Sequence, residues 1–272
     1  MLKRTITGIV FVAILLSAII IHPGTFFILF LLLTFLGLYE FYKMAEKTEV
    51  HVQKKAGILI GLLVYSSLSS YYLFDFVQLK HLSLCLILPF LLFITELYRR
   101  STMPIFNIGV SLMGIVYVAI PFALLSYLVV FDKSAMTGIY NPNILLGYLF
   151  LIWTSDTCAY LAGRSFGKRK LFNRISPKKT WEGAAGGFIL SLILAYVLSI
   201  YFTSLTVQNW LIIAAIVVIT GIFGDLTESM FKRSVGIKDS GVLLPGHGGI
   251  LDRFDAVFIS APCIWVYLSI IN

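Results

Sequence analysis

Hydrophobic residues run through this chain in long blocks, and short polar segments separate one block from the next. A helix that spans a membrane needs about 20 mostly apolar residues, and most of the blocks approach or reach that length. Pro121 should kink the fifth block or split it in two. We predict nine spanning helices, with eight or ten as alternatives, over residues 6–21, 25–42, 56–76, 82–97, 107–131, 143–163, 184–203, 209–228 and 255–271.

The composition agrees with this pattern, since 59% of the residues are hydrophobic, 12% are charged and the mean hydropathy is +0.93. A water-soluble fold could not cover that much apolar surface. We therefore predict an all-α, polytopic integral membrane protein. Lys3 and Arg4 stand before an apolar run, as in a signal peptide. No small-x-small cleavage site follows between Ser17 and Gly24, so we expect an uncleaved first helix.

Positive charges test the topology independently, because Lys and Arg are enriched in cytoplasmic loops. With the N-terminus inside, nine spans leave only Lys80 and Lys133 outside, so 19 of the 21 basic residues share one side. We therefore expect a cytoplasmic N-terminus and a C-terminus outside. The net charge of +8 follows in part from this bias, and a basic face also attracts anionic lipid headgroups and nucleotides. Nucleic-acid binding is not expected, because no soluble domain and no basic–aromatic platform is present.

The two halves of the chain differ in kind. Residues 1–131 are apolar spans with short loops, and residues 143–272 form the predicted catalytic region, with cytoplasmic loops at 164–183 and 229–254. The three cysteines all lie within predicted spans without metal-type spacing, and we interpret them as buried thiols. The acids of the first half are interpreted as interfacial anchors and local ion pairs beside Lys or Arg: Glu40, Glu46, Glu49 and Glu96.

Two carboxylate pairs lie on either side of the last polar loop. Asp225 and Glu228 are three residues apart at the end of the eighth span, which puts both on one face of a helix, and Lys232 continues that face. Asp252 and Asp255 repeat the spacing at the start of the ninth span. Two antiparallel helices should hold these pairs across a gap suited to one or two Mg²⁺ ions, with substrate phosphates as further ligands. The alternative is that the acids only form ion pairs with nearby cations, namely Lys232, Arg233 and Arg253.

Asp156 is a third acidic feature, because it lies inside the sixth span, about two helical turns before Arg164. A carboxylate at that depth in a membrane is costly and is by default a functional hypothesis. The alternative is a buried partner for an Arg or Lys on a neighbouring helix.

Two further polar segments are candidates for binding anions. Ser176, Lys178 and Lys179 lead into the seventh helix, whose N-terminal N–H groups and dipole favour a phosphate or pyrophosphate there. The run from Pro245 to Gly249 allows tight turns and a close approach of the backbone to a ligand. Its His247 is read with equal weight as a phosphate contact or acid–base group and as a packed turn residue. Zinc is not expected, since no second His or Cys lies nearby.

The segment from Ser229 to Asp255 closely resembles the signature of the phosphatidate cytidylyltransferases, also called CDP-diacylglycerol synthases. That signature runs Ser-x-apolar-Lys-Arg, four residues, Lys-Asp-x-small, and then apolar-Pro/Gly-x-His-Gly-Gly-apolar-x-Asp-Arg-apolar-Asp. Bacterial members are also similar at residues 155–157, 176–183 and 224–228, whereas the first half agrees only in being polytopic. Every fixed position of the signature is filled, by Ser229, Lys232, Arg233, Lys238, Asp239, Gly241, His247, Gly248, Gly249, Asp252, Arg253 and Asp255.

The resemblance implies that the chain makes CDP-diacylglycerol and pyrophosphate from CTP and phosphatidic acid, with Mg²⁺ required. One or two divalent ions are expected, and a second, different cation is an alternative. In-line attack by the lipid phosphate on the α-phosphorus of CTP needs no strong general base, so positioning and charge stabilisation should dominate catalysis. The expected metal ligands are Asp225 and Asp252, supported by Asp255, Glu228 and Asp156. Catalytic or phosphate contacts are expected from Lys232, Arg253, Arg233, Lys238, Ser176, Lys178, Lys179, His247, Gly248 and Gly249.

The expected location is the bacterial cytoplasmic membrane, with the active site facing the cytoplasm, and a homodimer through the first half is a further expectation. Two alternatives stay open at this point. The same chemistry on another lipid phosphate, such as an isoprenoid ether lipid, would use the same residues. A cation-coupled transporter is disfavoured, because transporters often carry repeats and midplane sites, whereas this chain shows no repeat and gathers its charge at one face.

Overall fold

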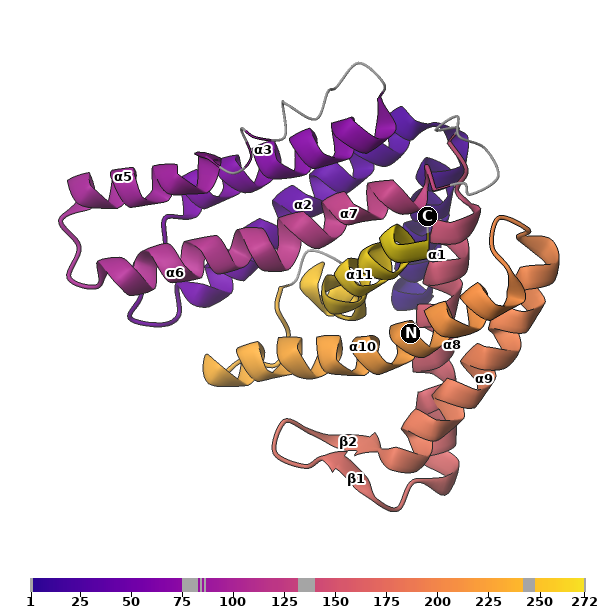
Figure 1. The fold of residues 1–272 in the computed structure, drawn as a ribbon. Helices are drawn as coiled ribbons and strands as arrows, with labels where there is room; N and C mark the ends of the chain where they lie inside the picture. Colours follow the sequence, from indigo (N-terminus) through magenta and orange to yellow (C-terminus); the bar gives the residue numbers. More distant parts are fainter. Residues whose placement is uncertain are drawn as a thin grey trace. The chain divides into compact units, whose positions relative to one another are not determined.

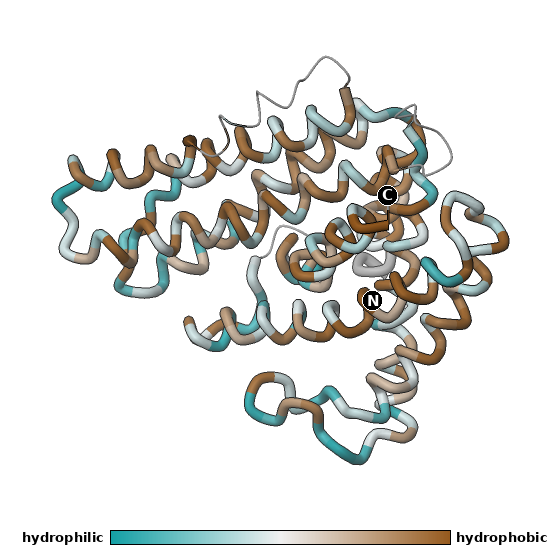
Figure 2. Tube along the Cα trace, viewed as in Figure 1, coloured by the Kyte–Doolittle hydropathy of each residue, from teal (hydrophilic) through white to brown (hydrophobic). Residues whose placement is uncertain are grey.

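The computed structural model describes residues 2–74, 83, 85, 87–131, 140–241 and 248–271, and most of this is helical (Figure 1). Figure 2 shows hydrophobic residues along the helices and hydrophilic ones in the turns that join them. Within the described residues, seven helices are long and apolar enough to cross a membrane. The prediction of an all-α, polytopic membrane protein is confirmed, while the exact number of spans and the sidedness of the termini stay predictions.

The first half consists of helices that follow the predicted apolar blocks. Its second helix begins where Pro23 occupies the first turn and the ring nitrogen Nδ1 of His22 accepts a hydrogen bond from the Gly24 N–H at 2.9 Å. The predicted span at 82–97 lies partly outside the described residues. The elements are α1 (Leu2–Ile21), α2 (Pro23–Ala45), α3 (Lys54–Leu73), the 3₁₀ turn η1 (Leu88–Phe90), α5 (Leu91–Arg99), α6 (Pro104–Gly114), the π turn η2 (Ile115–Ala119) and α7 (Ile120–Leu128).

Pro121 was expected to kink or split the fifth span, and a π turn indeed precedes it. The Ile120 N–H donates to the Ile115 carbonyl, five residues back, so the helix widens by one residue there. Proline has no N–H to continue the regular ladder. The span is therefore divided into α6, η2 and α7 without a break in the helical run.

The second half contains the longest helices and a short hairpin. The elements are α8 (Asn143–Phe166), β1 (Lys170–Phe172), β2 (Ser176–Thr180), α9 (Trp181–Tyr201), α10 (Val207–Ser234) and α11 (Leu251–Ile271). The antiparallel hairpin pairs Lys170 with Thr180 and Phe172 with Ser176. It lies in the loop expected at 164–183, where the hydrophobic pattern had predicted no strand.

The chain divides into two compact units that the linear sequence does not suggest. Unit 1 comprises residues 1–127 and 234–254, and unit 2 comprises residues 128–233 and 255–272. The described parts of the signature loop in unit 1, residues 234–241 and 248–254, thus pack with the N-terminal helices. Helix α11 passes from one unit to the other directly after Phe254, whose φ of −118° and ψ of 15° are not helical.

Each unit has its own packed interior. In unit 1, Phe30, Phe122 and Phe254 meet edge to face, with ring centroids 5.1–6.5 Å apart. In unit 2, α9 packs closely along α8 because small residues line the contact. A Cβ on Gly187 would lie 2.8 Å from the Ser155 carbonyl and 3.1 Å from the Ala159 Cβ. The opposite side of α9 exposes apolar side chains that fit a lipid environment: Ile189, Leu190, Ile193, Tyr196 and Ile200.

Candidate active site and metal centre

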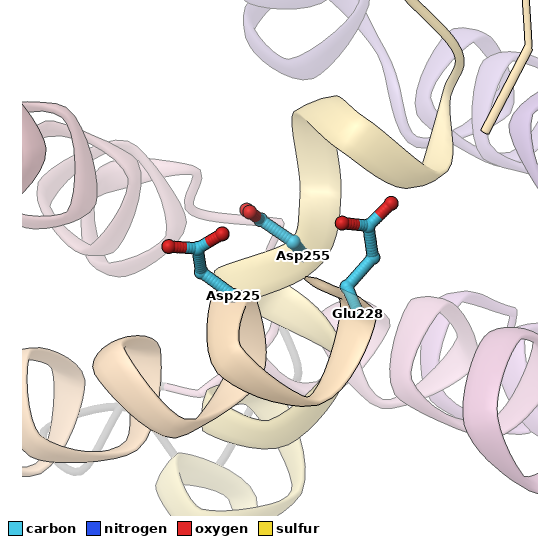
Figure 3. Close-up of side chains that lie close together, drawn as sticks. All are labelled: Asp225, Glu228 and Asp255. Atoms are coloured by element: carbon cyan, nitrogen blue, oxygen red, sulfur yellow. The ribbon is translucent and has the colours of Figure 1, made fainter. Parts of the chain in front are cut away.

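Three carboxylates of unit 2 meet where α10 and α11 face each other. Asp225 and Glu228 project from one face of α10, as their spacing predicts, and Asp255 reaches them from α11 (Figure 3). One carboxylate oxygen of each lies within 4.8 Å of the other two. Glu228 is buried, and the two aspartates are partly buried. We call Asp225, Glu228 and Asp255 the carboxylate cluster.

The close approach of the two helices depends on glycine. A Cβ on Gly224 would collide with the Asp255 carbonyl oxygen and would lie 3.0 Å from the Ala256 Cα. One turn earlier, a Cβ on Gly221 would make only an ordinary contact, 3.4 Å from the Ala256 Cβ. Gly224 therefore lets the Asp255 backbone approach α10, and this brings the side chain of Asp255 to those of Asp225 and Glu228.

Two lysines balance part of the negative charge. Lys179, at the end of β2, forms an ion pair with Asp225, and Lys232 forms one with Glu228 a helical turn earlier on α10. The Glu228 side chain is only 1% exposed and that of Lys232 is 11% exposed. A buried charge is tolerated when it is paired, so the two lysines offset part of the negative charge of Asp225 and Glu228.

Asp156, which lies on α8, interacts electrostatically with residues of the carboxylate cluster and with Lys179. Its strongest charged partners are Lys179 and Asp225, and it also acts on Asp255. Lys179 lies on β2 and not on a neighbouring helix, so it is not the helical partner considered in the sequence analysis. Both the functional role and the structural role of Asp156 stay predictions.

The donor set of the carboxylate cluster fits a hard divalent cation. Mg²⁺ and Ca²⁺ bind oxygen ligands, and Mg²⁺ commonly takes one or two carboxylates and completes its shell with water and phosphate oxygens. Carboxylates held this close repel one another unless a proton or a cation lies between them. The residues that would hold such an ion are Asp225, Glu228 and Asp255, with Asp156 nearby.

Asp252 lies in unit 1, where its carboxylate is held by backbone and hydroxyl donors. Its Oδ2 accepts hydrogen bonds from the Ser240 N–H at 3.0 Å, the Ser240 hydroxyl at 3.0 Å and the Gly249 N–H at 2.9 Å. Gly248 has a φ of 81°, and a Cβ there would lie 2.6 Å from the same oxygen. These contacts give a local reason for the Gly-Gly of the signature. The metal role predicted for Asp252 stays a prediction.

The anion site predicted before the seventh helix has a different local structure from the one expected. Ser176 lies in the strand pairing of the hairpin, and the Thr180 hydroxyl caps α9 by accepting from the Gly183 N–H at 3.2 Å. The Glu182 carboxylate accepts from the Lys168 and Arg169 N–H groups at 3.0–3.2 Å. Lys178 is exposed, whereas Lys179 reaches Asp225. Phosphate binding by these residues stays a prediction.

The other predicted phosphate contacts are exposed cations. Arg233 lies in the last turn of α10, and Lys238 and Arg253 flank the signature loop in unit 1. His247 lies outside the described residues.

Glu40 is the residue whose interpretation the structure corrects. It was expected to be an interfacial anchor beside a cation, but it is 2% exposed and its carboxylate binds the Leu251 N–H and the Ser240 hydroxyl. Its position inside the predicted span 25–42 could have indicated this burial, because an ionisable residue within a membrane span is rare and usually has a function. By contrast, the expected local ion pairs of Glu46 with Lys54 and of Glu96 with Arg99 are present, at 3.2 and 2.9 Å.

Comparison with known proteins shows the family to which this chain belongs. A model of the cytidylyltransferase family matches residues 2–271. A phosphatidate cytidylyltransferase of Bacillus subtilis is 30% identical over 274 residues, which cover 100% of this chain and 99% of the relative. One from Staphylococcus saprophyticus is 35% identical over 97% of this chain and 98% of its own. One from Haemophilus influenzae is 46% identical over 130 residues, 45% of each chain. The chain therefore belongs to the cytidylyltransferase family of nucleotidyltransferases, as the signature had suggested.

Proposed function

We propose that this protein transfers the cytidylyl group of CTP to phosphatidic acid and releases pyrophosphate, with CDP-diacylglycerol as the lipid product. The single observation that carries this proposal is the carboxylate cluster with its two lysines, which combines a cation site with positive charge for phosphates. The full-length relatives that bear the name phosphatidate cytidylyltransferase support the choice of substrates.

The chemistry requires the chain to position two anionic substrates. An oxygen of the lipid phosphate forms a bond to the α-phosphorus of CTP, and the bond from that phosphorus to the bridging oxygen of pyrophosphate breaks. The lipid phosphate is already ionised near neutral pH, so no group of the protein needs to remove a proton. The protein must instead hold the reacting atoms in line and stabilise the charge that builds on the leaving phosphates.

The carboxylate cluster would hold Mg²⁺ through Asp225, Glu228 and Asp255. When bound there, the ion would supply positive charge to the phosphate oxygens. Lys179 and Lys232 already lie against two of these carboxylates, so each can exchange part of its ion pair for a phosphate oxygen. Arg233, Lys238 and Arg253 are exposed and are further phosphate contacts in this proposal.

The site belongs at a membrane edge, because CTP comes from water and the lipid comes from the bilayer. Helix α10 fits this requirement, since its apolar part precedes Asp225 and its last turn carries Lys232 and Arg233. We expect the active site to face the cytoplasm of a bacterial inner membrane, in keeping with the predicted distribution of basic residues. A homodimer through the first half stays a prediction, which the mass of the protein in detergent tests.

The experiment is an assay of purified protein in detergent with CTP labelled at the α-phosphate, phosphatidic acid and Mg²⁺, with and without EDTA. Label in CDP-diacylglycerol, equal release of pyrophosphate and loss of both in EDTA are the expected results. No product from folded protein with phosphatidic acid, but product with another lipid phosphate, would replace the substrate while keeping the chemistry. No product with any lipid phosphate would overturn the proposed reaction.

A further inference from the structure

Glu40 connects the N-terminal helices to the signature loop within unit 1. It lies on α2, and its Oε2 accepts hydrogen bonds from the Leu251 N–H at 3.1 Å and the Ser240 hydroxyl at 3.3 Å. These partners are 211 and 200 residues away in the sequence. With 2% of its surface exposed, Glu40 is buried like a core residue although it is a carboxylate.

The contact to Leu251 caps helix α11 from another element. The first N–H groups of a helix have no partner within the helix and are usually satisfied by a side chain just before it. Gly248, Gly249 and Ile250 precede α11, and none of them has a side chain that can accept a hydrogen bond. Glu40 supplies this acceptor instead, at the Leu251 N–H.

Ser240 extends the contact to Asp252. The Ser240 hydroxyl lies 3.3 Å from Glu40 Oε2 and 3.0 Å from Asp252 Oδ2, so its one proton is shared between the two carboxylates. The same Asp252 oxygen also accepts from the N–H of Ser240. Glu40 therefore fixes both the beginning of α11 and the serine that holds Asp252. Ser240 and Leu251 are thus both held by Glu40.

The surroundings of Glu40 are closely fitted to its carboxylate. A Cβ on Gly241 or on Gly249 would collide with it, so a side chain at either position would displace the carboxylate. Glu40 Oε1 is buried in the same surroundings.

We propose that Glu40 is a positioning residue for cytidylyl transfer, which holds the first turn of α11 and Ser240 so that Asp252 keeps its orientation. It does not touch a substrate in this role. The inference rests on the proposed function only where turnover is measured, and a second measurement below is independent of turnover.

The first test compares Glu40→Ala and Glu40→Gln with the wild type in the CDP-diacylglycerol assay. Loss of a residue that orients a ligand costs about 10- to 100-fold in activity, so kcat of Glu40→Ala should fall by this factor. KM for CTP should change by less than about threefold, since no substrate contact is lost. Glu40→Gln keeps a carbonyl acceptor of the same shape and should stay within about fivefold of the wild type. Wild-type kcat in Glu40→Ala, or equal losses in both variants, would overturn the proposal.

The matched control is Glu46→Ala at the end of the same helix. Glu46 is exposed and forms an ion pair with Lys54, so its loss should leave kcat unchanged. The second measurement is hydrogen–deuterium exchange of the segment 248–254 in the full-length protein. Glu40→Ala should exchange faster there than the wild type, and Glu46→Ala should not. Unchanged exchange in Glu40→Ala would overturn the capping role whatever the activity, whereas an inactive wild type would overturn only the proposed function.

Discussion

Three carboxylates and two lysines lie together at the contact of α10 and α11, and at the residue scale their charges define the site. Because the two lysines pair with Asp225 and Glu228, part of the charge is already balanced without an ion. Asp255 differs from the other two, since its strongest charged neighbours are Asp225 and Asp156, both acidic. A cation at the cluster would therefore relieve more repulsion at Asp255 than at Asp225 or Glu228.

Asp225→Asn tests whether the carboxylate cluster carries the reaction. The change keeps the shape of the side chain and removes its charge, so turnover should fall by more than about 100-fold, beyond the loss typical of an outer-shell partner. CDP-diacylglycerol formation measures this, and size-exclusion chromatography in detergent checks that the protein is folded. Glu49→Gln, an exposed acid in a loop, is the control and should keep full activity. Near-normal turnover in Asp225→Asn would remove the cluster from the mechanism.

Lys179→Ala tests the ion pair that links β2 to the cluster. Loss of this cation should lower kcat/KM for CTP by about tenfold or more, because Asp225 loses its partner and the phosphates lose a positive charge. Lys170→Ala, on the neighbouring strand of the hairpin, should have little effect. A double variant with Asp225→Asn should lose no more than Asp225→Asn alone, because residues that act together are not additive. Additive losses would show that Lys179 acts apart from Asp225.

At the scale of elements, glycines decide how closely the helices approach. Gly224 lets the backbone at Asp255 approach α10, and Gly187 lets α9 approach α8. Close packing through small residues is typical of helices in membranes, where van der Waals contact replaces the hydrophobic effect between helices. The hairpin that follows α8 then carries Lys179 to Asp225.

Gly224→Ala and Gly221→Ala form a matched pair on α10. The added methyl group collides with the Asp255 carbonyl at position 224 but makes an ordinary contact at position 221. Overpacking of this kind costs about 1–3 kcal/mol, so Gly224→Ala should lower the thermal midpoint in detergent and reduce turnover, while Gly221→Ala should do neither. Equal behaviour of the two variants would mean that the contact between α10 and α11 does not depend on Gly224.

At the scale of the whole molecule, the features that could be predicted from the sequence are those set by residues close together in the chain. The apolar blocks of residues 25–42 and 143–163 became α2 and α8, because hydrocarbon length dictates the length of a span. The spacing of Asp225 and Glu228 correctly placed both on one face of α10. Both inferences need only residues that are close in the chain.

Features that depend on distant residues could not be predicted in the same way. Glu40 is held by Ser240 and Leu251, more than 190 positions later, so its neighbours in sequence suggested only an ion pair. The hairpin at 170–180 has a Pro and three Lys and lacks the apolar alternation of a strand. The grouping of residues 234–254 with the N-terminal helices likewise follows from packing, since no linker marks it.

The most direct measurement is the dependence of CDP-diacylglycerol formation on Mg²⁺ concentration for the wild type and Asp255→Asn, assayed side by side with CTP and phosphatidic acid. We expect no wild-type product in EDTA, recovery when Mg²⁺ is added back, and no recovery in Asp255→Asn at any Mg²⁺ concentration. Product formation by the wild type in EDTA, or an Asp255→Asn curve that overlies that of the wild type, would contradict a metal-dependent cytidylyl transfer at the carboxylate cluster.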